Sequence, residues 1–514
     1  MRCALVLGLG ESGLAMARWL ARESWTVRVA DTRDEPPMLG ELRLQLPQAQ
    51  FRPGPLGLDQ LAGIDLLAVS PGLSLRADPV RALAAAAAQA GIETIGEMEL
   101  FARALEQLRR ERDYAPRIVG VTGTNGKTTT ARMVAKMIER WGRSVCLAGN
   151  ISPSALDALR GALDAGQLPQ FWVLELSSFQ LASTTSLACT AAAVLNLSQD
   201  HLDWHGSFDD YVACKRRIFA PSTSFVVNRD DPLTRAMRSK DGRGASFGMG
   251  APEAPGQFGL VRDAGLTWLA CTDEEQAPLR RRRTPPGLGG AMAAPGHADT
   301  AEPRPVHRLM PLEALAVRGT HNAMNALAAL ALYRAVGGPL ASALRALGEF
   351  RGAPHRTETV ARIGGVEYVD DSKGTNVGAT VAALRGLADP AGGARRIIVI
   401  LGGDGKGQTF EPLADAVRAH VRAVLLIGKD APRIAEALQG TDVPMTVVAD
   451  LPLAVHAAAA LAQAGDIVLL SPACASFDAF RNYAHRAQVF AAAVRELAAG
   501  GNAVPSDAQP ESLP

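Results

Sequence analysis

Apolar runs that suit β-strands alternate with alanine-rich stretches that suit α-helices along almost the whole chain. Strands that alternate with helices form parallel sheets with helices on both faces, because each helix returns the chain to the edge where the next strand starts. At 514 residues the chain is also too long for a single hydrophobic core. We therefore predict an α/β fold of three domains, each built around a mostly parallel sheet.

The strand-like runs fall into three groups, which define domains at residues 1–97, 98–352 and 353–500. Within the second domain, residues 272–310 contain four consecutive arginines, several Pro and Gly, and no periodicity, which predicts a flexible surface insertion. The arginines either contact an anion or, in the simpler interpretation, lie in solvent. We predict that residues 501–514 form a disordered tail.

Charge and cysteine content exclude several classes of protein. The 53 basic and 52 acidic residues leave a net charge of +1, so no basic field favours nucleic acid or an anionic membrane. Apolar stretches are too short or too interrupted to cross a bilayer, and the start of the chain lacks a signal-peptide pattern. The six scattered cysteines form no C-x-x-C pair, which indicates free thiols in a reducing cytoplasm.

Lysine is rare in this chain. Only seven of the 53 basic residues are lysine, and arginine fills nearly every other position. Unless this is chance, a retained lysine is expected where a guanidinium would not serve. Four of the seven lie in the motifs described below, namely Lys127, Lys215, Lys373 and Lys406.

The first glycine loop is GLGESG, with Gly8, Gly10 and Gly13 between a strand-like run and a helical one. Asp31 ends the next strand-like run, so the pattern is typical of a dinucleotide-binding turn in which the acid meets a ribose. An NAD-dependent dehydrogenase or any protein that holds a nucleotide diphosphate satisfies it. The triplet Ser70–Gly72, after the third strand, is either a further ligand contact or an ordinary turn.

The second glycine loop, VTGTNGKTTT at residues 121–130, resembles the phosphate loop G-x-x-x-x-G-K-[ST] but has Val121 at the first glycine. An apolar strand-like run precedes it and a helical stretch follows, which is the context that a phosphate loop needs. Successive backbone N–H groups would hold phosphate oxygens, Lys127 would reach the β- and γ-phosphates, and Thr128 would contact Mg²⁺. The central domain is therefore predicted to bind ATP.

A magnesium site beside the phosphates requires oxygen ligands. Glu175 ends the apolar run FWVLE at the edge of the sheet where ligands bind, so we predict that it contacts the metal. The segment DHLDWHG adds His201, Asp203 and His205, but imidazole is a less typical Mg²⁺ ligand than carboxylate and either ring could cap a loop. Lys215 lies on a predicted helix, where a solvated face is its simplest interpretation.

Eight motifs occur in the order found in the Mur ligases: GTNGKTTT, LELSSFQ, DHLDWHG with a later lysine, HNAMNALAA, PHR, DDSKGTN, LGGDGKG and SPACASFDAF. The chain resembles this family from Cys3 to about Leu497. ELSSFQ, DSKGTN and SPACASFDAF are most similar to the member that adds D-glutamate. The family's phosphate loop has the same shortened form, so Val121 is regular.

The resemblance implies an ATP-dependent amide ligase that joins D-glutamate to UDP-N-acetylmuramoyl-L-alanine through an acyl phosphate and a tetrahedral intermediate. It further implies Rossmann-like N- and C-terminal domains, for the UDP substrate and the amino acid, on either side of an ATP-binding phosphate-loop domain. Two Mg²⁺ sites, a cytoplasmic location and a monomer without nucleic-acid partner or membrane insertion are expected. We also expect the third domain to close when ligands bind.

The resemblance assigns roles to individual residues. The UDP substrate would contact Gly10, Glu11, Ser12, Asp31, Thr32, Arg33, Ser70, Gly72, Asn150 and His201. ATP would contact Gly123, Thr124, Asn125, Gly126, Lys127, Thr128, Thr129, Asn322, Asn325, Arg356 and Asp371. Metal ligands would be Thr128, Glu175, His201 and a carbamate formed from CO₂ on Lys215. D-glutamate would contact Lys373, Thr375, Lys406, Ser476 and Tyr483. Catalysis would depend on Lys127, Glu175, His201, Lys215 and Arg356.

Two positions depart from the family pattern, since Gly374 stands where alanine is frequent and Tyr483 where phenylalanine is expected. Three alternatives remain. A folylpolyglutamate synthase would share the ATP loop, but GLGESG and DSKGTN argue against it. A dehydrogenase would leave Lys127 and Glu175 without a role, and a nucleotide-binding regulator would hydrolyse no ATP in response to substrates.

Overall fold

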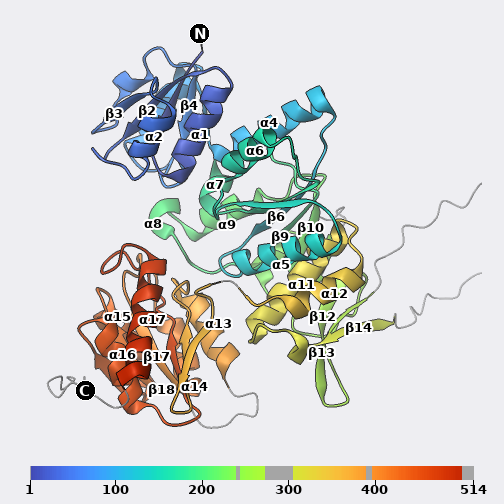
Figure 1. Cartoon of the computed structure of the whole chain (residues 1–514), viewed down its shortest axis with the longest axis vertical. Helices are drawn as coiled ribbons and strands as arrows, with labels where there is room; N and C mark the ends of the chain where they lie inside the picture. The colour runs from blue at the N-terminus through green and yellow to red at the C-terminus, as the bar shows by residue number, and fades with distance from the viewer. Residues whose placement is uncertain (1, 239–243, 273–304, 353, 389–395, 501–514) are drawn as a thin grey trace, which may run out of the picture.

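The computed structural model describes residues 2–238, 244–272, 305–352, 354–388 and 396–500. Its strands form three sheets of five, nine and six strands, and each sheet is covered by helices (Figure 1). The α/β architecture with three mostly parallel sheets agrees with the predicted fold class.

The N-terminal sheet is entirely parallel in the order β3-β2-β1-β4-β5. Its strands are β1 (Cys3–Leu7), β2 (Thr26–Asp31), β3 (Gln50–Pro53), β4 (Leu66–Val69) and β5 (Glu93–Ile95). Its helices are α1 (Glu11–Arg22), α2 (Leu39–Gln45) and α3 (Val80–Gln89), with a 3₁₀ turn η1 (Leu58–Leu61). A Cβ on Gly13 would lie 1.9 Å from the carbonyl oxygen of Gly8, so only glycine lets α1 start this close to β1.

The central sheet has the order β14-β13-β12-β11-β10-β9-β6-β8-β7, and it is parallel except for β13, which runs antiparallel to both of its neighbours, β12 and β14. Its strands are β6 (Arg117–Thr122), β7 (Val145–Gly149), β8 (Phe171–Glu175), β9 (Ala191–Val194), β10 (Ser224–Asn228), β11 (Gly244–Phe247), β12 (Gln257–Asp263), β13 (Leu266–Thr272) and β14 (Val306–Pro311). The helices before residue 217 are α4 (Glu97–Arg112), α5 (Lys127–Arg140), α6 (Ala155–Asp164), α7 (Ser178–Ala182), α8 (Leu202–His205) and α9 (Phe208–Arg216). The later ones are α10 (Pro232–Ala236), η2 (Leu312–Ala314), α11 (Thr320–Ala335) and α12 (Leu340–Glu349).

The third sheet has the order β15-β16-β20-β17-β18-β19 and is parallel except for the edge strand β15. Its strands are β15 (Glu358–Ile363), β16 (Val366–Asp370), β17 (Ile397–Gly402), β18 (Val421–Ile427), β19 (Met445–Val447) and β20 (Ile467–Leu470). Its helices are α13 (Val377–Leu387), α14 (Ala414–His420), α15 (Ala431–Leu438), α16 (Leu451–Leu461) and α17 (Tyr483–Gly500), with 3₁₀ turns η3 (Glu411–Leu413) and η4 (Gln439–Thr441).

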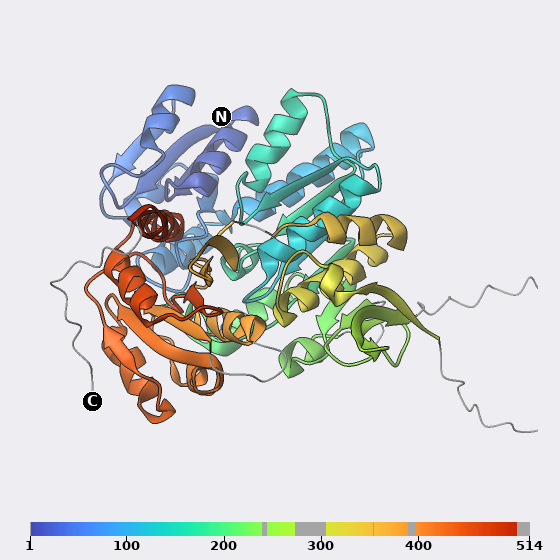
Figure 2. The ribbon, with the colours of Figure 1, turned by 60° about the horizontal axis from the view of Figure 1, so that its bottom comes forward.

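Polar contacts join the N-terminal domain to the central one. Arg18 on α1 forms a 2.8 Å ion pair with Asp157 on α6. The hydroxyl of Ser74 donates to the carbonyl of Trp204 at 2.8 Å, and Arg76 pairs with Asp210 on α9 at 2.5 Å. The N-terminal domain is thus seated on α6, α8 and α9, and Figure 2 shows its blue ribbon beside the cyan and green ribbon of the central domain.

Residues 273–304 and 501–514, which hold most of the predicted insertion and the predicted tail, lie outside the described residues. The prediction of an unstructured insertion up to residue 310 is wrong at its C-terminal end, because Val306–Pro311 form β14 and pair antiparallel with β13. Only the last part of this edge strand, around Met310, is buried, so six residues carry too little alternation to signal a strand.

All six cysteines lie within the described residues, and no disulfide joins any of them, as predicted. A search of the described helices for a segment long and apolar enough to cross a membrane finds none.

Candidate functional site

The first glycine loop lines a pocket of about 440 Å³ at the carboxyl edge of the N-terminal sheet. Eight of the ten residues predicted for the UDP substrate line it: Gly10, Glu11, Ser12, Asp31, Thr32, Arg33, Ser70 and Gly72. Ser70 does more than follow a strand, because its hydroxyl donates to the carbonyl of Gly8 at 2.7 Å and fixes the glycine loop.

The carboxylate of Asp31 is almost fully hydrogen-bonded within the protein. Its Oδ2 accepts from the backbone N–H of Leu9 at 2.7 Å, and both oxygens accept from the guanidinium of Arg33 at 2.7 and 2.8 Å. Burial raises the pKa of Asp31, but the hydrogen bonds from Arg33 and Leu9 outweigh it and lower the pKa to about 2. Asp31 is therefore an anion that holds Arg33 at the mouth of the pocket.

Asn150 and His201, the other two residues predicted for this substrate, do not line the pocket. Asn150 Nδ2 donates to Glu175 at 3.0 Å, in the central domain. A neighbour connects the two regions, because the hydroxyl of Ser152 donates to Glu11 of the pocket at 3.0 Å.

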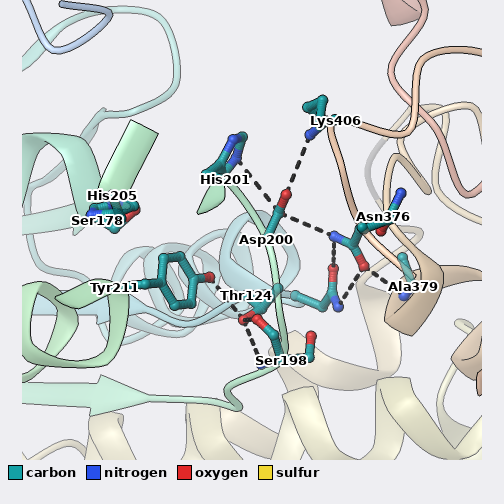
Figure 3. A network of polar contacts seen from close by, with 12 residues as sticks. Thr124, Ser178, Ser198, Asp200, His201, His205, Tyr211, Asn376, Ala379 and Lys406 are labelled. Atoms are coloured by element: carbon teal, nitrogen blue, oxygen red, sulfur yellow. Dashed lines mark hydrogen bonds and ion pairs between the residues drawn. The ribbon is translucent and has the colours of Figure 1, made fainter. Parts of the chain in front are cut away.

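The second glycine loop connects β6 to α5, in the predicted strand–loop–helix context. Gly126, at the N-cap of α5, has a φ of +84°, and an added Cβ would lie 2.3 Å from Asn325 Oδ1. Thr124 Oγ1 accepts from the backbone N–H of Ser198 at 3.0 Å and lies 2.8 Å from the hydroxyl of Tyr211 (Figure 3). The loop is held from several sides, and its glycine cannot be replaced without strain.

Two lysines converge on this loop. Lys127 Nζ donates to the carbonyls of Gly123 and Thr124, each at 2.9 Å. Lys215 Nζ donates to the same carbonyl of Gly123 at 2.8 Å and to Thr122 Oγ1 at 3.3 Å. Burial lowers the pKa of both amines, and for Lys215, which is 2% exposed, burial and the nearby Lys127 lower it well below its ordinary value. The solvated-face interpretation of Lys215 is therefore wrong.

A pocket of about 350 Å³ lies between the phosphate loop, α11 and the start of the third domain. Seven of the residues predicted for ATP line it: Asn125, Gly126, Thr129, Asn322, Asn325, Arg356 and Asp371. The other four, Gly123, Thr124, Lys127 and Thr128, lie in the adjoining loop and the first turn of α5. Arg356 reaches that turn, because its Nη2 donates to Thr128 Oγ1 at 2.7 Å.

Glu175 ends β8 as predicted and is only 2% exposed. Its Oε1 accepts from Asn150, but its Oε2 is buried without a hydrogen-bond partner. Burying an unpaired carboxylate oxygen is unfavourable, so this atom fits a site that a cation completes. The predicted metal ligands are not gathered on a common point in this structure, since Thr128 is bonded to Arg356 and Lys215 to Gly123.

His201 and His205 occupy different environments. His201 is the N-cap of α8 and lies 3.5 Å from Asp200, and burial lowers its pKa to about 4. His205 is fully buried, and its Nε2 lies 2.9 Å from the hydroxyl of Ser178 (Figure 3). Burial also lowers the pKa of His205 to about 4. Both rings are neutral at pH 7, so His201 can serve as a ligand while His205 packs α8 against α7.

The residues predicted for D-glutamate belong to three loops of the third domain and to the first residue of α17. Lys373 Nζ lies 3.6 Å from the ring centre of Tyr483, and burial lowers the pKa of Lys373 to about 8. Thr375 bonds through its backbone N–H to the carbonyl of Lys373 at 2.9 Å. Lys406 instead crosses to the central domain and pairs with Asp200 at 3.3 Å. Ser476 is buried at 2% exposure.

Three residues at this junction escaped the sequence reasoning. Asn376 exchanges hydrogen bonds with Asn125 of the phosphate loop, and Asp200 meets Lys406, Asn376 and His201. Arg486 is 1% exposed, and its guanidinium donates to the carbonyls of Ser372 and Cys474 at 2.9 and 3.1 Å. Asn376 and Asp200 stand inside quoted motifs, but only three-dimensional contacts reveal their partners.

The fold and the site together define a multidomain nucleotide-binding enzyme, with a phosphate loop in the second domain and a pocket between that loop and the third domain. Three family descriptions match the chain in order. The "Mur ligase MurD-like, N-terminal domain" matches residues 2–96, the "Mur ligase middle domain" residues 121–258, and the "Mur ligase, glutamate ligase domain" residues 355–474.

Relatives with similar sequences extend this match over nearly the full length. A protein of Ralstonia nicotianae named UDP-N-acetylmuramoylalanine–D-glutamate ligase is 52% identical, over 96% of this chain and 97% of its own. One of Cupriavidus pinatubonensis with the same name is also 52% identical, over 98% of both chains. The chain therefore belongs to the Mur ligase family, and the predicted family and ligase class are confirmed.

Solved structures agree in fold. The UDP-N-acetylmuramate–alanine ligase MurC of Thermotoga maritima matches with a TM-score of 0.55 at 19% identity, over 96% of this chain and 99% of that one. The MurF ligase of Thermotoga maritima, solved in complex with ADP, matches with a TM-score of 0.54 at 17% identity, over 84% and 90% of the two chains. The family descriptions and the 52% identical relatives exclude the dehydrogenase alternative, because residues 2–96 match the N-terminal domain of a Mur ligase.

Proposed function

We propose that this enzyme joins D-glutamate to UDP-N-acetylmuramoyl-L-alanine and converts one ATP to ADP and phosphate. The observation that carries the proposal is that the phosphate loop, the third domain and the N-terminal pocket are joined by hydrogen bonds. A phosphate loop meets Arg356 and Asn376 of the third domain, while Ser152 connects the central domain to the pocket at Glu11. The names of relatives that are 52% identical support the choice of substrates.

The N-terminal pocket would hold the uridine diphosphate group. Its glycines allow close approach of a diphosphate to the backbone, and α1 begins there with its free N–H groups. The ionised Asp31 holds Arg33 in place to pair with a phosphate or ribose oxygen. Asn150 and His201 would meet the distal, alanine-bearing end of the substrate, since they lie outside the pocket near Glu175.

ATP would occupy the pocket between the phosphate loop and the third domain, with Asn322, Asn325 and Asp371 along its length. Lys127 now bonds to carbonyls of its own loop and would turn to the β- and γ-phosphates when ATP binds. Arg356 would exchange its bond to Thr128 for a phosphate oxygen.

Glu175, His201 and Thr128 would hold Mg²⁺, and the orphan oxygen of Glu175 supports this assignment. When bound, the metal neutralises charge on the phosphate oxygens that react. Lys215 would complete a second site as a carbamate. Burial lowers the pKa of the Lys215 amine well below its ordinary value, which favours the neutral form, and a neutral amine is the form that adds to CO₂.

The reaction would proceed in two steps. A carboxylate oxygen of the alanine attacks the γ-phosphorus, the bond to the β–γ bridging oxygen breaks, and ADP leaves. The amine of D-glutamate then attacks the acyl carbon, and the tetrahedral intermediate loses phosphate and a proton to give the amide. Lys127 and Arg356 would stabilise charge on the transferring phosphoryl group, because cationic groups fixed beforehand reorganise little during the reaction.

D-glutamate would bind among Lys373, Thr375, Lys406, Ser476 and Tyr483. The positive charge of the lysines matches an amino acid with two carboxylates. Lys406 pairs with Asp200 in this structure, so it would exchange partners as D-glutamate enters. The Tyr483 ring lies under the Lys373 ammonium group, and the Tyr483 hydroxyl would add a polar group to the D-glutamate pocket.

Domain boundaries near residues 97 and 352 fit the proposal that the first domain binds the UDP substrate, the second ATP and the third D-glutamate. The first sheet ends at Ile95 and the second begins at Arg117, while the second ends at Pro311 and the third begins at Glu358. We infer that the third domain closes when ligands bind and that the enzyme is a monomer. We also infer a cytoplasmic location, which the absence of disulfides among the six cysteines supports.

The decisive experiment measures phosphate release by the purified enzyme with ATP, Mg²⁺ and UDP-N-acetylmuramoyl-L-alanine. We expect release only when D-glutamate is added, with L-glutamate as the matched control. Equal release with both stereoisomers, or release without any amino acid, contradicts the proposal.

A further inference from the structure

The first turn of α13 is bonded directly to the phosphate loop. Asn125 Nδ2 donates to Asn376 Oδ1 at 3.2 Å, and Asn376 Nδ2 donates back to Asn125 Oδ1 at 3.0 Å. The two amides thus exchange hydrogen bonds between the second and the third domain (Figure 3). Asn125 is itself fixed through its main chain, because its N–H and C=O bond to the side chain of Asn196 at 2.8 and 3.1 Å.

Asn376 uses both ends of its amide. It is the N-cap of α13, and its Oδ1 accepts from the backbone N–H of Ala379 at 2.9 Å. Its Nδ2 has a second acceptor in Asp200 Oδ2, at 3.4 Å. The side chain is 4% exposed, so a group that could not donate from this position would leave buried oxygens facing one another.

The helix approaches the loop closely because Gly378 has no side chain. An added Cβ at this position would lie 3.1 Å from Ser198 Oγ and 3.2 Å from Asn125 Nδ2. No unusual φ explains this glycine. The lack of a side chain at Gly378 leaves space for the amide of Asn125.

The same turn continues into the residues proposed for D-glutamate. Thr375 immediately precedes Asn376, and its N–H bonds to the carbonyl of Lys373. A shift of the phosphate loop therefore reaches the amino-acid site through one short, hydrogen-bonded segment. Lys406 adds a second connection, since it pairs with Asp200, which also accepts from Asn376.

We propose that Asn376 is a positioning residue that couples occupancy of the phosphate loop to the affinity for the amino acid. The pairing with Asn125 forms only when the loop has the conformation seen here and α13 lies against it. ATP that stabilises this loop conformation also stabilises the placement of Lys373 and Thr375. This inference rests on the proposed function, because it assumes that ATP and D-glutamate occupy these two sites.

The sharpest variant is Asn376→Asp. Aspartate caps helices as well as asparagine does, so the bond to Ala379 and the fold are retained. The new carboxylate cannot donate to Asn125, and it repels Asp200 across 3.4 Å. Asn376→Ser keeps a capping oxygen but reaches neither partner, so it removes the pairing without adding a charge. A matched control is Asp450→Asn, the reverse exchange at the N-cap of α16 in the same domain.

The measurement is D-glutamate affinity by calorimetry with the UDP substrate present, with and without a non-hydrolysable ATP analogue. In the wild type the analogue should tighten D-glutamate binding. Asn376→Asp should reduce this ratio by roughly 10-fold or more and Asn376→Ser by less, because both variants lose hydrogen bonds but only the aspartate is also repelled by Asp200. Asp450→Asn should leave the ratio unchanged. A helix cap without a coupling role would lower stability and leave the ratio intact.

Gly378→Ala supplies an independent readout. Alanine favours a helix over glycine, so melting temperature should stay the same or rise. The methyl group would nevertheless push α13 away from Asn125 and raise the KM for D-glutamate by roughly 10-fold. The inference is overturned if both Asn376 variants keep the wild-type ratio of D-glutamate affinities with and without the analogue. It is also overturned if the analogue does not change the D-glutamate affinity of the wild type. A wild type that ligates no D-glutamate contradicts the proposed function instead.

Discussion

Glu99 on α4 connects the first helix of the central domain to the loop before β9, and its replacement makes a quantitative prediction. The carboxylate is 2% exposed and accepts from the N–H groups of Thr185 and Ser186 at 2.8 and 2.9 Å. Arg103 donates to it as well, at 2.9 Å. Burial raises the pKa of Glu99, but these hydrogen bonds outweigh it and lower the pKa from 4.5 to about 2.

The magnitude follows from the two pKa values. A carboxyl whose pKa falls by this amount on folding contributes about 3 kcal/mol to stability when it is ionised in both states. Because the folded state has the lower pKa, the contribution is complete above the unfolded pKa of 4.5 and is lost as the pH falls toward 2. At pH 3 the unfolded chain already binds nearly one proton more, so about 2 kcal/mol is gone.

The assay is urea unfolding of wild type and Glu99→Gln, followed by tryptophan fluorescence. Trp172 is a local reporter, since its ring packs edge-on against Phe101 of α4 at 5.1 Å. The wild type should unfold at higher urea than the variant at pH 7, and the difference should shrink by about 2 kcal/mol at pH 3. Glu106→Gln on the same helix is the control, because Glu106 pairs with arginines in solvent and should change little at either pH. A difference between wild type and Glu99→Gln that is constant from pH 7 to pH 3 refutes the reasoning.

Three further substitutions probe the site. Glu175→Ala should lower turnover by at least ~100-fold while the UDP substrate still binds in calorimetry, and normal turnover would refute the metal assignment. Lys215→Ala should be nearly inactive and recover partly in acetate, which can replace the carbamate; inactivity at every acetate concentration argues against the carbamate. Gly126→Ala forces a left-handed φ on alanine at a cost of about 1–2 kcal/mol and displaces Asn325, so the KM for ATP should rise by roughly 10-fold, which steady-state kinetics measures directly.

The fold was predictable because its signals are local. Strand β1 is a fully buried run, CALVL, that is too short for a helix and is followed by Gly8, and α1 starts at the glycine turn itself. Strand β14 was missed for the opposite reason. It is an edge strand whose outer residues are exposed, so its short segment shows neither a continuous apolar run nor a clear alternation.

The site was predictable as far as glycine loops and motifs reach. Residues that lie close together in the sequence, such as Asp31 and Arg33, also meet in the pocket. The environment of Lys215 could not be foreseen, because Arg216 and Arg217 follow it directly in the sequence. Of these three basic residues, the packing of α9 buries only the lysine. Burial that depends on how a helix packs is a tertiary property, so local sequence does not encode it.

Contacts between domains are the least predictable part, and the proposed coupling of the two sites depends on them. Asn125 and Asn376 are 251 residues apart, and each has an ordinary local role, in a phosphate loop and at a helix cap. Neither role requires the other residue, so no periodicity or spacing links them. What links them is the fit between two separately folded domains, and a reaction whose ATP and amino-acid sites lie in different domains needs that fit in order to join its two steps.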